Sequence, residues 1–425
     1  MGERQVAVGD LMPGLYVVAL DRPWLGTPFL FQGFSIEGEP ELRELRRLCR
    51  HVFIDEARSR GDALRQLDAG ESSATPGDAN EDAPSSPDRG DVAAAFGIAA
   101  YPEFQRFWPL VRVARDARDR GRRVVDRILE DARLGHSIDA DAARSVVREL
   151  VTVISENASA SLWLTNLRQR DEYTANHCLN VCVLAIAFGR HLGLGREELE
   201  ALGLGGLLHD VGKMRTPEAI LKKPGVLSKA EREIIRRHPD EGVELLSREG
   251  GMPKAVLEMV RLHHERVNGK GYPLGLTGDV IPRPVLVVGI CDVYDAMTSD
   301  RAYQEGIPPD RVLRLLFERA DQDFGQELTE AFIRCLGIYP AGSLVELDDG
   351  SLAVVVSASP EARLHPVVML VRHPDGRLYD RRVMLNLAEL ARDNTRETRN
   401  IRHVVNPGAH DIDVAAVLAA DIAAH

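Results

Sequence analysis

The sequence lacks several features that would place the protein in large functional classes. It has no run of about 18 apolar residues, the length that a membrane-crossing helix needs, and its first residues show no basic stretch followed by an apolar one. Positive charge is not in excess either, because the formal net charge is -12, which argues against a protein that wraps DNA or RNA. We therefore expect a cytoplasmic protein without a membrane span and without a nucleic-acid partner.

Cysteine and aromatic residues are also scarce. The five cysteines are odd in number and lie in apolar surroundings, which suits buried thiols in a reducing compartment better than a disulfide framework. Aromatic residues make up 5% of the chain, yet Trp24, Phe29, Phe31 and Phe34 lie in one short stretch. This aromatic cluster indicates either the core of a small domain or a docking surface.

Isoleucine, leucine, valine and aromatic residues are all absent from residues 70–91. Such a segment buries too little surface to offset the entropy lost on ordering, so it predicts a flexible tether. The chain then divides into a small α/β accessory domain (1–57), a linker (58–92), a helical lead-in (93–160), a helical domain (161–340), a small β unit (341–390) and a tail (391–425). The β unit is indicated by two hairpin signals, around Gly350 and Gly376, and the fold class is mainly α.

An adjacent His209–Asp210 pair closes a stretch of small and apolar residues and offers two ligands to divalent metals. Alone, such a pair is more often a buried hydrogen bond or a helix cap. Here five histidines and two aspartates lie in apolar sequence, which is more than a satisfied core is expected to carry. These residues are His177, His209, Asp210, His238, His263, His264 and Asp292.

Six motifs, in order along residues 165 to 340, resemble the HD-GYP domain, the bacterial cyclic-di-GMP phosphodiesterase branch of the HD phosphohydrolases. They are Asp171 to His177, His209 to Lys213, Pro217 to Gly225, His238-Pro239, His263 to Pro273 and Asp292 to Tyr303. The resemblance implies an HD-type helical bundle. The segment around the aromatic cluster resembles a domain of unknown function that often precedes HD-GYP domains, and it implies no chemistry.

The resemblance further implies a centre of two divalent metal ions. His177, His209, Asp210 and Asp292 would hold one metal, and Asp210 would bridge to a second. The second would also be held by His238, His263 and His264. Mixed histidine and carboxylate ligation fits iron or manganese, with zinc as the alternative. A metal pair can activate water and neutralise phosphate charge, so no protein nucleophile is required.

The family pattern also implies contacts with the substrate. Lys213 would contact the scissile phosphate, and Arg301 would bind a phosphate oxygen. Arg266 and Tyr272 are candidates for the rim of the pocket. Asp295, three residues after Asp292 on a predicted helix, is expected to support the site or to form an ion pair.

The sequence departs from the family pattern at a few positions. Asn268 replaces an aspartate, Lys270 replaces a serine, and Gln304 replaces a basic residue. Tyr173 stands where a glutamate, one helical turn before the first histidine, supplies a ligand in members with three metals. Because tyrosine has a reference pKa near 10, it is a poor metal ligand at neutral pH, and two metals are predicted.

The predicted function is hydrolysis of cyclic-di-GMP to pGpG, with further cleavage to GMP left open. Two alternatives are a non-catalytic cyclic-di-GMP sensor and an HD phosphohydrolase of another nucleotide. The complete set of ligands argues against the sensor, and the Gly-Tyr-Pro sequence at Tyr272 argues against the other nucleotide. A homodimer, and protein partners at the N-terminal unit or the Gly-Tyr-Pro loop, also remain open.

Overall fold

The computed structural model of the protein describes residues 3–21, 34–36, 38–56, 58–70, 107–165, 173–248, 250–299, 306–357, 364–392, 399–405 and 412. The chain forms two compact units, Met1–Ala99 and Ala100–His425. Within the described ranges, no helix is long and apolar enough to cross a membrane.

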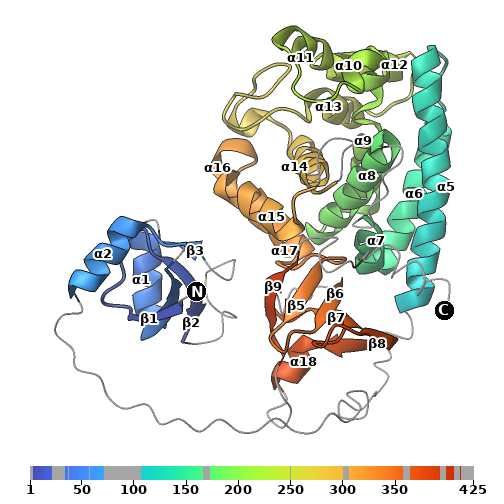
Figure 1. The fold of residues 1–425 in the computed structure, drawn as a ribbon. Coiled ribbons are helices and arrows are strands. Elements are labelled where there is room, and N and C mark those ends of the chain that lie inside the picture. Colours follow the sequence, from blue (N-terminus) through green and yellow to red (C-terminus); the bar gives the residue numbers. More distant parts are fainter. Residues whose placement is uncertain are drawn as a thin grey trace. The chain divides into compact units, whose positions relative to one another are not determined.

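In its described residues, the N-terminal unit is a four-stranded antiparallel sheet accompanied by two helices (Figure 1). Its elements are β1 (Glu3–Ala7), β2 (Tyr16–Leu20), β3 (Phe34–Ser35), α1 (Glu39–Leu48), β4 (His51–Asp55) and α2 (Gly61–Gly70). The strand order β1-β4-β2-β3 places β4 between β1 and β2, and its alternate residues Val52 and Ile54 are fully buried. The predicted α/β unit is confirmed. Of the aromatic cluster, only Phe34 lies within the described residues.

Helix α2 corrects the predicted start of the linker. Residues 58–92 are predicted to be a tether, but the segment 61–70 is helical, and its Ala63 and Leu67 are buried. The backbone N–H of Arg60 also donates to the carbonyl of Gly14 at 2.7 Å. The reason is that apolar side chains still recur every four residues up to Leu67, and the composition becomes that of a tether only after Gly70. Residues 71–92 lie outside the described part of the chain.

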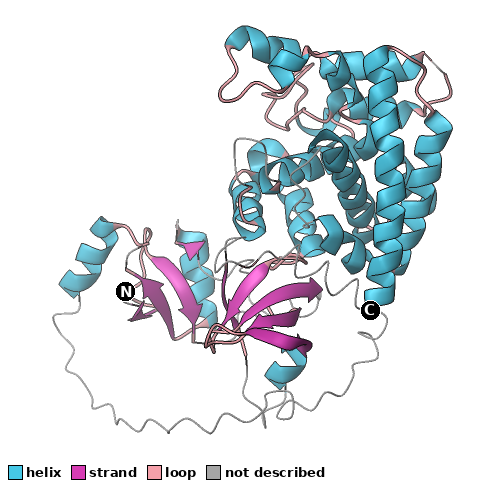
Figure 2. Cartoon of the chain, turned by 45° about the vertical axis from the view of Figure 1, so that its right-hand side comes forward, coloured by secondary structure: helices cyan, strands magenta, loops and turns pink. Residues whose placement is uncertain are grey.

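The second unit is mainly a helical bundle (Figures 1 and 2). It begins with α5 (Phe107–Leu134), α6 (Ala140–Glu156) and α7 (Ala158–Thr165). The next elements are α8 (Tyr173–His191), α9 (Arg196–Leu208), η1 (Val211–Arg215), α10 (Glu218–Leu221), α11 (Lys229–Ile235), α12 (His238–Ser247), α13 (Lys254–Leu262), η2 (Gly278–Val280), α14 (Arg283–Thr298), α15 (Pro309–Glu318), α16 (Ala320–Asp323) and α17 (Gln326–Leu336).

Helix α8 lies at the centre of this bundle. Every residue from Ala175 to Gly189 is buried, as expected for a helix that is covered on all sides. Helix α5, in contrast, is amphipathic: Val111, Ala114 and Ala117 are buried, whereas neighbouring charged residues such as Arg115 are exposed. Asp139 caps the N-terminus of α6, since its carboxylate accepts a hydrogen bond from the Ala142 N–H at 2.8 Å.

The C-terminal β unit is a five-stranded antiparallel sheet of order β8-β7-β6-β5-β9. Its elements are β5 (Leu344–Leu347), β6 (Leu352–Ser357), β7 (Val367–Arg372), β8 (Leu378–Asn386), α18 (Leu387–Arg392) and β9 (Ile401–Val404). The two predicted hairpins are confirmed by the pairs β5–β6 and β7–β8. The sheet shares one buried core with the helices, in which Val354 and Met369 lie with Val111 of α5 and Trp163 of α7.

Strand β9 corrects the predicted end of the β unit. The sequence suggests a tail from residue 391, but Val345 and Glu346 of β5 pair with Val404 and His403. Without β9, strand β5 would expose a row of unpaired backbone groups at the edge of the sheet, and the short strand covers them. Its sequence signal is weak because Ile401 is the one residue of β9 that is buried.

Candidate metal centre

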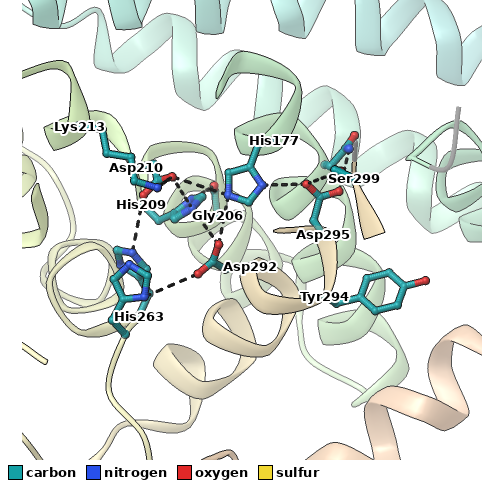
Figure 3. Close-up of polar contacts among 12 residues, drawn as sticks. His177, Gly206, His209, Asp210, Lys213, His263, Asp292, Tyr294, Asp295 and Ser299 are labelled. Atoms are coloured by element: carbon teal, nitrogen blue, oxygen red, sulfur yellow. Dashed lines mark hydrogen bonds and ion pairs between the residues drawn. The ribbon is translucent and has the colours of Figure 1, made fainter. Parts of the chain in front are cut away.

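The structure brings together all seven of the metal ligands predicted from the sequence, in two adjoining groups. Figure 3 shows His177, His209, Asp210, His263 and Asp292 among them. The potential ligand atoms of His177, His209 and Asp292 lie within 4.8 Å of one another, and the same limit holds for Asp210, His238, His263 and His264. Six of the seven residues are buried, and the His264 side chain is 18% exposed. Seven polar side chains thus converge on one place inside the helical bundle.

Five separate segments supply these side chains. His177 lies in α8, and His209 and Asp210 follow the end of α9. His238 begins α12, His263 and His264 follow α13, and Asp292 lies in α14. The two consecutive histidines lie where the helix ends, which lets both rings turn to the same site although neighbouring helical residues normally diverge by about 100°.

Asp210 lies between the two groups and faces both. Its Oδ1 is 3.2 Å from His238 Nε2 and 3.8 Å from His263 Nε2. Its Oδ2 is 3.4 Å from His209 Nε2 and 3.7 Å from His177 Nε2. Each carboxylate oxygen therefore points to a different set of imidazole nitrogens, which is the arrangement that a bridging ligand needs.

The backbone fixes which nitrogen three of the histidines present to the site. Nδ1 of His209, His238 and His263 lies 2.8, 2.7 and 2.8 Å, respectively, from the carbonyl oxygen of the residue three positions earlier. A carbonyl can only accept, so each Nδ1 carries the hydrogen and each Nε2 presents a lone pair when the ring is neutral. The histidines are thus oriented with a basic nitrogen toward Asp210.

His177 is oriented by a carboxylate in place of a carbonyl. Its Nδ1–H donates to Asp295 Oδ2 at 2.7 Å, and its Nε2 lies 3.1 Å from Asp292 Oδ1 (Figure 3). The other oxygen of Asp295 accepts from Asn180 Nδ2 at 2.8 Å. The structure confirms the prediction that Asp295 supports the site, and a carboxylate in this position fixes the ring and raises its strength as a ligand.

Several contacts in this cluster are unfavourable unless a cation is shared. The Nε2 atoms of His238 and His263, both with their Nδ1 hydrogens used elsewhere, are 3.3 Å apart. Within the described residues, His209 Nε2 and Asp210 Oδ1 are buried without a hydrogen-bond partner. A buried polar atom without a partner is costly, and two divalent cations, one in each group of ligands, would satisfy these four atoms. The residues present therefore fit a metal centre.

The protonation states of His263, His264 and Asp210 fit as well, whereas His209 would release a proton on binding a metal: burial lowers its pKa, but Asp210 and Asp292 raise it to about 10. Burial, followed by the charges of the neighbouring histidines, holds the pKa of His263 well below its ordinary value, and burial is also the main cause that lowers the pKa of His264. Burial alone would raise the pKa of Asp210, but His209 and Lys213 hold it well below its usual range. Neutral imidazoles and an ionised carboxylate are the forms that bind metals.

Of the predicted substrate contacts, Lys213 and Tyr272 lie beside the cluster of ligands. Lys213 in η1 places its Nζ against Asp210 Oδ2, beside the cluster. Tyr272 stacks on His264 with ring centroids 4.4 Å apart, and the guanidinium carbon of Arg236 lies 4.9 Å from the centre of the same ring. Lys213 and Tyr272 therefore border the site. Arg301, and Gln304 beside it, lie outside the described residues.

Arg266, which the sequence suggests for the rim of the substrate pocket, also contacts the backbone, and its place at the rim stays a prediction. Its Nη1 donates to the carbonyls of His263 at 3.0 Å and Glu265 at 2.7 Å. Its guanidinium also lies over the ring of Phe324, 4.6 Å from the centroid. The side chain is used in this way because the carbonyls at the end of α13 have no partner within the helix. Arg266 supports the segment that carries the two histidines.

Sequence reasoning missed Glu265, which organises the Gly-Tyr-Pro loop. Its side chain is buried, and its two oxygens accept hydrogen bonds from the backbone N–H groups of Leu274, Gly275 and Leu276 at 2.7, 3.1 and 2.9 Å. The loop after Tyr272 is thereby tied to the residue that follows His264. A buried acid beside two predicted ligands was the available signal, but its donors are backbone groups, which have no sequence signature.

Gly212 lies where η1, which follows Asp210, packs against α12, which begins with His238. A Cβ atom added there would lie 2.0 Å from the carbonyl oxygen of His238 and 2.5 Å from the N atom of Gly242, so η1 and α12 touch backbone to backbone. We expect Gly212→Ala to shift α12, to separate His238 from Asp210 and to reduce bound metal, as measured by elemental analysis. Gly61→Ala, where the nearest atom is 3.8 Å away, is the control that should change nothing. Full metal content in Gly212→Ala would contradict the prediction.

Two family models and several known proteins match this chain. The family model described as HD domain matches residues 153–328, and the one described as a domain of unknown function (DUF3391) matches residues 3–143. A cyclic di-GMP phosphodiesterase of Pseudomonas aeruginosa is 35% identical over 369 residues, covering 86% of this chain and 84% of that protein.

Other relatives match the second unit alone. A cyclic di-GMP phosphodiesterase response regulator of Xanthomonas campestris is 35% identical over 169 residues, 40% of this chain and 45% of that protein. A 3'3'-cGAMP-specific phosphodiesterase of Vibrio cholerae is 35% identical over 164 residues, 38% of each chain. The chain thus spans less than half the length of these two. Among solved structures, an HDG"Y"P protein from Bdellovibrio bacteriovorus gives a TM-score of 0.45 at 18% identity, covering 78% of this chain and 98% of that one.

Proposed function

Because the chain belongs to the HD-GYP family of HD-domain cyclic di-GMP phosphodiesterases, we propose that it hydrolyses cyclic di-GMP to pGpG with the aid of two divalent metal ions. The observation that carries the proposal is the position of Asp210, whose two oxygens face two separate groups of imidazole nitrogens. Cleavage of pGpG on to GMP is a second step that the same site can perform if the linear product binds again.

We propose that His177, His209, Asp210 and Asp292 hold one metal, and that Asp210, His238, His263 and His264 hold the other. A metal pair bound there supplies an activated water and absorbs charge on the phosphoryl oxygens. Histidine with carboxylate ligation favours iron or manganese, with zinc as the alternative. Tyr173 begins α8, and its side chain lies outside the described residues, so the prediction of two metals and not three stays a prediction.

The chain's own residues would orient the substrate. Lys213 places a positive charge beside Asp210, where it can pair with a non-bridging oxygen of the scissile phosphate. Tyr272, stacked on His264, borders one side of the centre. Asp295 holds the Nδ1–H of His177, so that its Nε2 stays directed to the metal side. Arg301 remains proposed as a phosphate contact.

Three further proposals concern the location of the protein and its partners. The protein is proposed to act in the cytoplasm. Homodimerisation and protein partners at the N-terminal unit or the Gly-Tyr-Pro loop are also proposed; the loop's Leu274 has an exposed fraction of 53%, which a partner could cover.

Turnover by the anaerobically purified protein tests the function. We expect cyclic di-GMP to be converted to pGpG, separated by chromatography, and we expect slower cleavage of 3'3'-cGAMP, the substrate named for the Vibrio cholerae relative. Binding of cyclic di-GMP by metal-loaded protein without any cleavage would support the sensor instead. Faster cleavage of 3'3'-cGAMP than of cyclic di-GMP would overturn the choice of substrate and keep the metal centre.

A further inference from the structure

A line of buried and partly buried polar contacts leads away from the metal centre to helix α5. His177 Nδ1 donates to Asp295 Oδ2 at 2.7 Å, as Figure 3 shows. Asn180 Nδ2 donates to Asp295 Oδ1 at 2.8 Å, and Asn180 Oδ1 accepts from Arg118 Nη2 at 3.0 Å. The line therefore runs without a gap from α5 through α8 and α14 to a proposed metal ligand.

Arg118 fixes the orientation of the Asn180 amide. In the observed orientation, the amide oxygen meets the guanidinium and the amide nitrogen meets the carboxylate of Asp295. Turning the amide over would place its hydrogens against the guanidinium hydrogens and its oxygen against the carboxylate, so both contacts would become repulsive. The cation on α5 thus ensures that Asp295 receives a hydrogen bond.

The contacts of Asp295 are buried, and the contact of Arg118 with Asn180 is partly buried. Asn180, Asp295 and His177 have exposed fractions of 5%, 2% and 3%. Burial lowers the pKa of Arg118 to about 10, although the charge of Asp295 opposes the shift, so the guanidinium remains charged at neutral pH. In such surroundings a hydrogen bond from a charged group is stronger than at the surface, and its loss leaves a buried acceptor unsatisfied.

The packing of α5 keeps Arg118 within reach. Gly121 lies about one turn further along α5, and a Cβ atom there would be 3.1 Å from Val146 Cγ1 and 3.2 Å from Leu179 Cδ1. Leu179 is the neighbour of Asn180 in α8. A glycine at this point lets α5 approach α8 closely at the level of the polar line.

We propose that Arg118 is a positioning residue of the metal centre, which holds Asn180 and Asp295 and through them the imidazole of His177. Arg118 lies outside the match to the HD domain (153–328) but inside the match to the domain of unknown function (3–143). The segment that precedes the HD domain therefore completes the metal centre. The inference rests on the proposed metal-binding function.

Metal affinity of the whole chain tests this role. We expect Arg118→Met to weaken Mn²⁺ binding about tenfold, the lower end of the effect of removing a group that orients a ligand. Arg118→Lys, which keeps a cationic donor, should recover part of the loss. Arg120→Ala removes an exposed ion pair with Glu149 from the same helix and should leave the affinity unchanged. The measurement is the dissociation constant of Mn²⁺, obtained by competition with a chelator.

A double-mutant cycle separates positioning from simple stabilisation. If Arg118 acts through Asn180, then Asn180→Ala should weaken Mn²⁺ binding by itself, and adding Arg118→Met should cause no further loss. A purely structural arginine would lower the melting temperature in either background and leave the Mn²⁺ dissociation constant of the folded protein unchanged; that result would overturn the proposal. If Arg118→Met does not fold, Arg118→Lys and Asn180→Ala decide in the same way.

The readout also separates this inference from the proposed function. Wild-type protein that binds no Mn²⁺ would contradict the metal centre itself. Wild-type protein that binds Mn²⁺ without cleaving cyclic di-GMP would contradict the enzymatic function and leave the Arg118 test intact.

Discussion

Asp210→Ala is expected to lose bound metal and cyclic di-GMP hydrolysis together. The carboxylate faces His238 at 3.2 Å on one side and His209 at 3.4 Å on the other, so its removal leaves two cations without their shared anion. A metal contributes several kcal/mol to stabilising charge in such a transition state, and each 1.36 kcal/mol is a factor of ten in rate. The fall in kcat/KM should therefore be at least about 10³-fold.

Asp240→Ala is the matched control for this variant. Asp240 lies two residues after His238, is 56% exposed and pairs with Arg261 on the surface. Its removal should change neither metal content nor turnover, because exposed ion pairs contribute little. Metal content by elemental analysis and turnover by chromatography are measured on the same samples. Near wild-type hydrolysis by Asp210→Ala would refute the two-metal mechanism.

Lys213→Ala is expected to reduce kcat/KM about 10²-fold or more while the metal content stays that of the wild type, as for the loss of one charged group that stabilises a transferring phosphoryl group. The structure sharpens this expectation, because Lys213 Nζ contacts Asp210 Oδ2. A lysine that served only to hold Asp210 would lower metal content when removed. The combination of slow turnover and full metal content is specific to a phosphate contact.

Lys222→Ala provides the comparison, since Lys222 pairs with Glu218 and its side chain is 77% exposed. It should keep wild-type kcat/KM. Loss of metal in Lys213→Ala would assign the lysine to the metal centre, and unchanged kcat/KM would assign it to the surface. Either result would remove Lys213 from the proposed substrate contacts.

The seven proposed ligands could be predicted because each lies in a short motif with its own local signal. His209 and Asp210 are adjacent, His263 and His264 are adjacent, and Asp292 follows an apolar run from Val285 to Cys291. Only the resemblance to HD-GYP domains implied that the two groups of ligands share Asp210, because the sharing depends on the directions in which its two carboxylate oxygens point. The Nδ1 contacts to backbone carbonyls, which set the nitrogen that three histidines turn to the site, could not be predicted at all.

Contacts between residues that lie far apart in the sequence could not be predicted. Arg118 and Asn180 are 62 residues apart, and Arg118 lies among the alternating charges of α5, a pattern more typical of a solvated face. The functions of Glu265 and Arg266 depend on backbone groups of a loop and a helix end. The boundaries at α2 and β9 differ from those that composition indicates, because composition marks a tether or tail poorly where a few apolar residues, such as Leu67 or Ile401, are still buried in a core.

Anomalous scattering from crystals of the whole chain, grown anaerobically with Mn²⁺, tests the central claim most directly. We predict two peaks about 3.5 to 4 Å apart, with Asp210 between them. His177, His209 and Asp292 should surround one peak, and His238, His263 and His264 the other. A single peak, or a third fully occupied peak within ligand distance of Tyr173, would contradict the account.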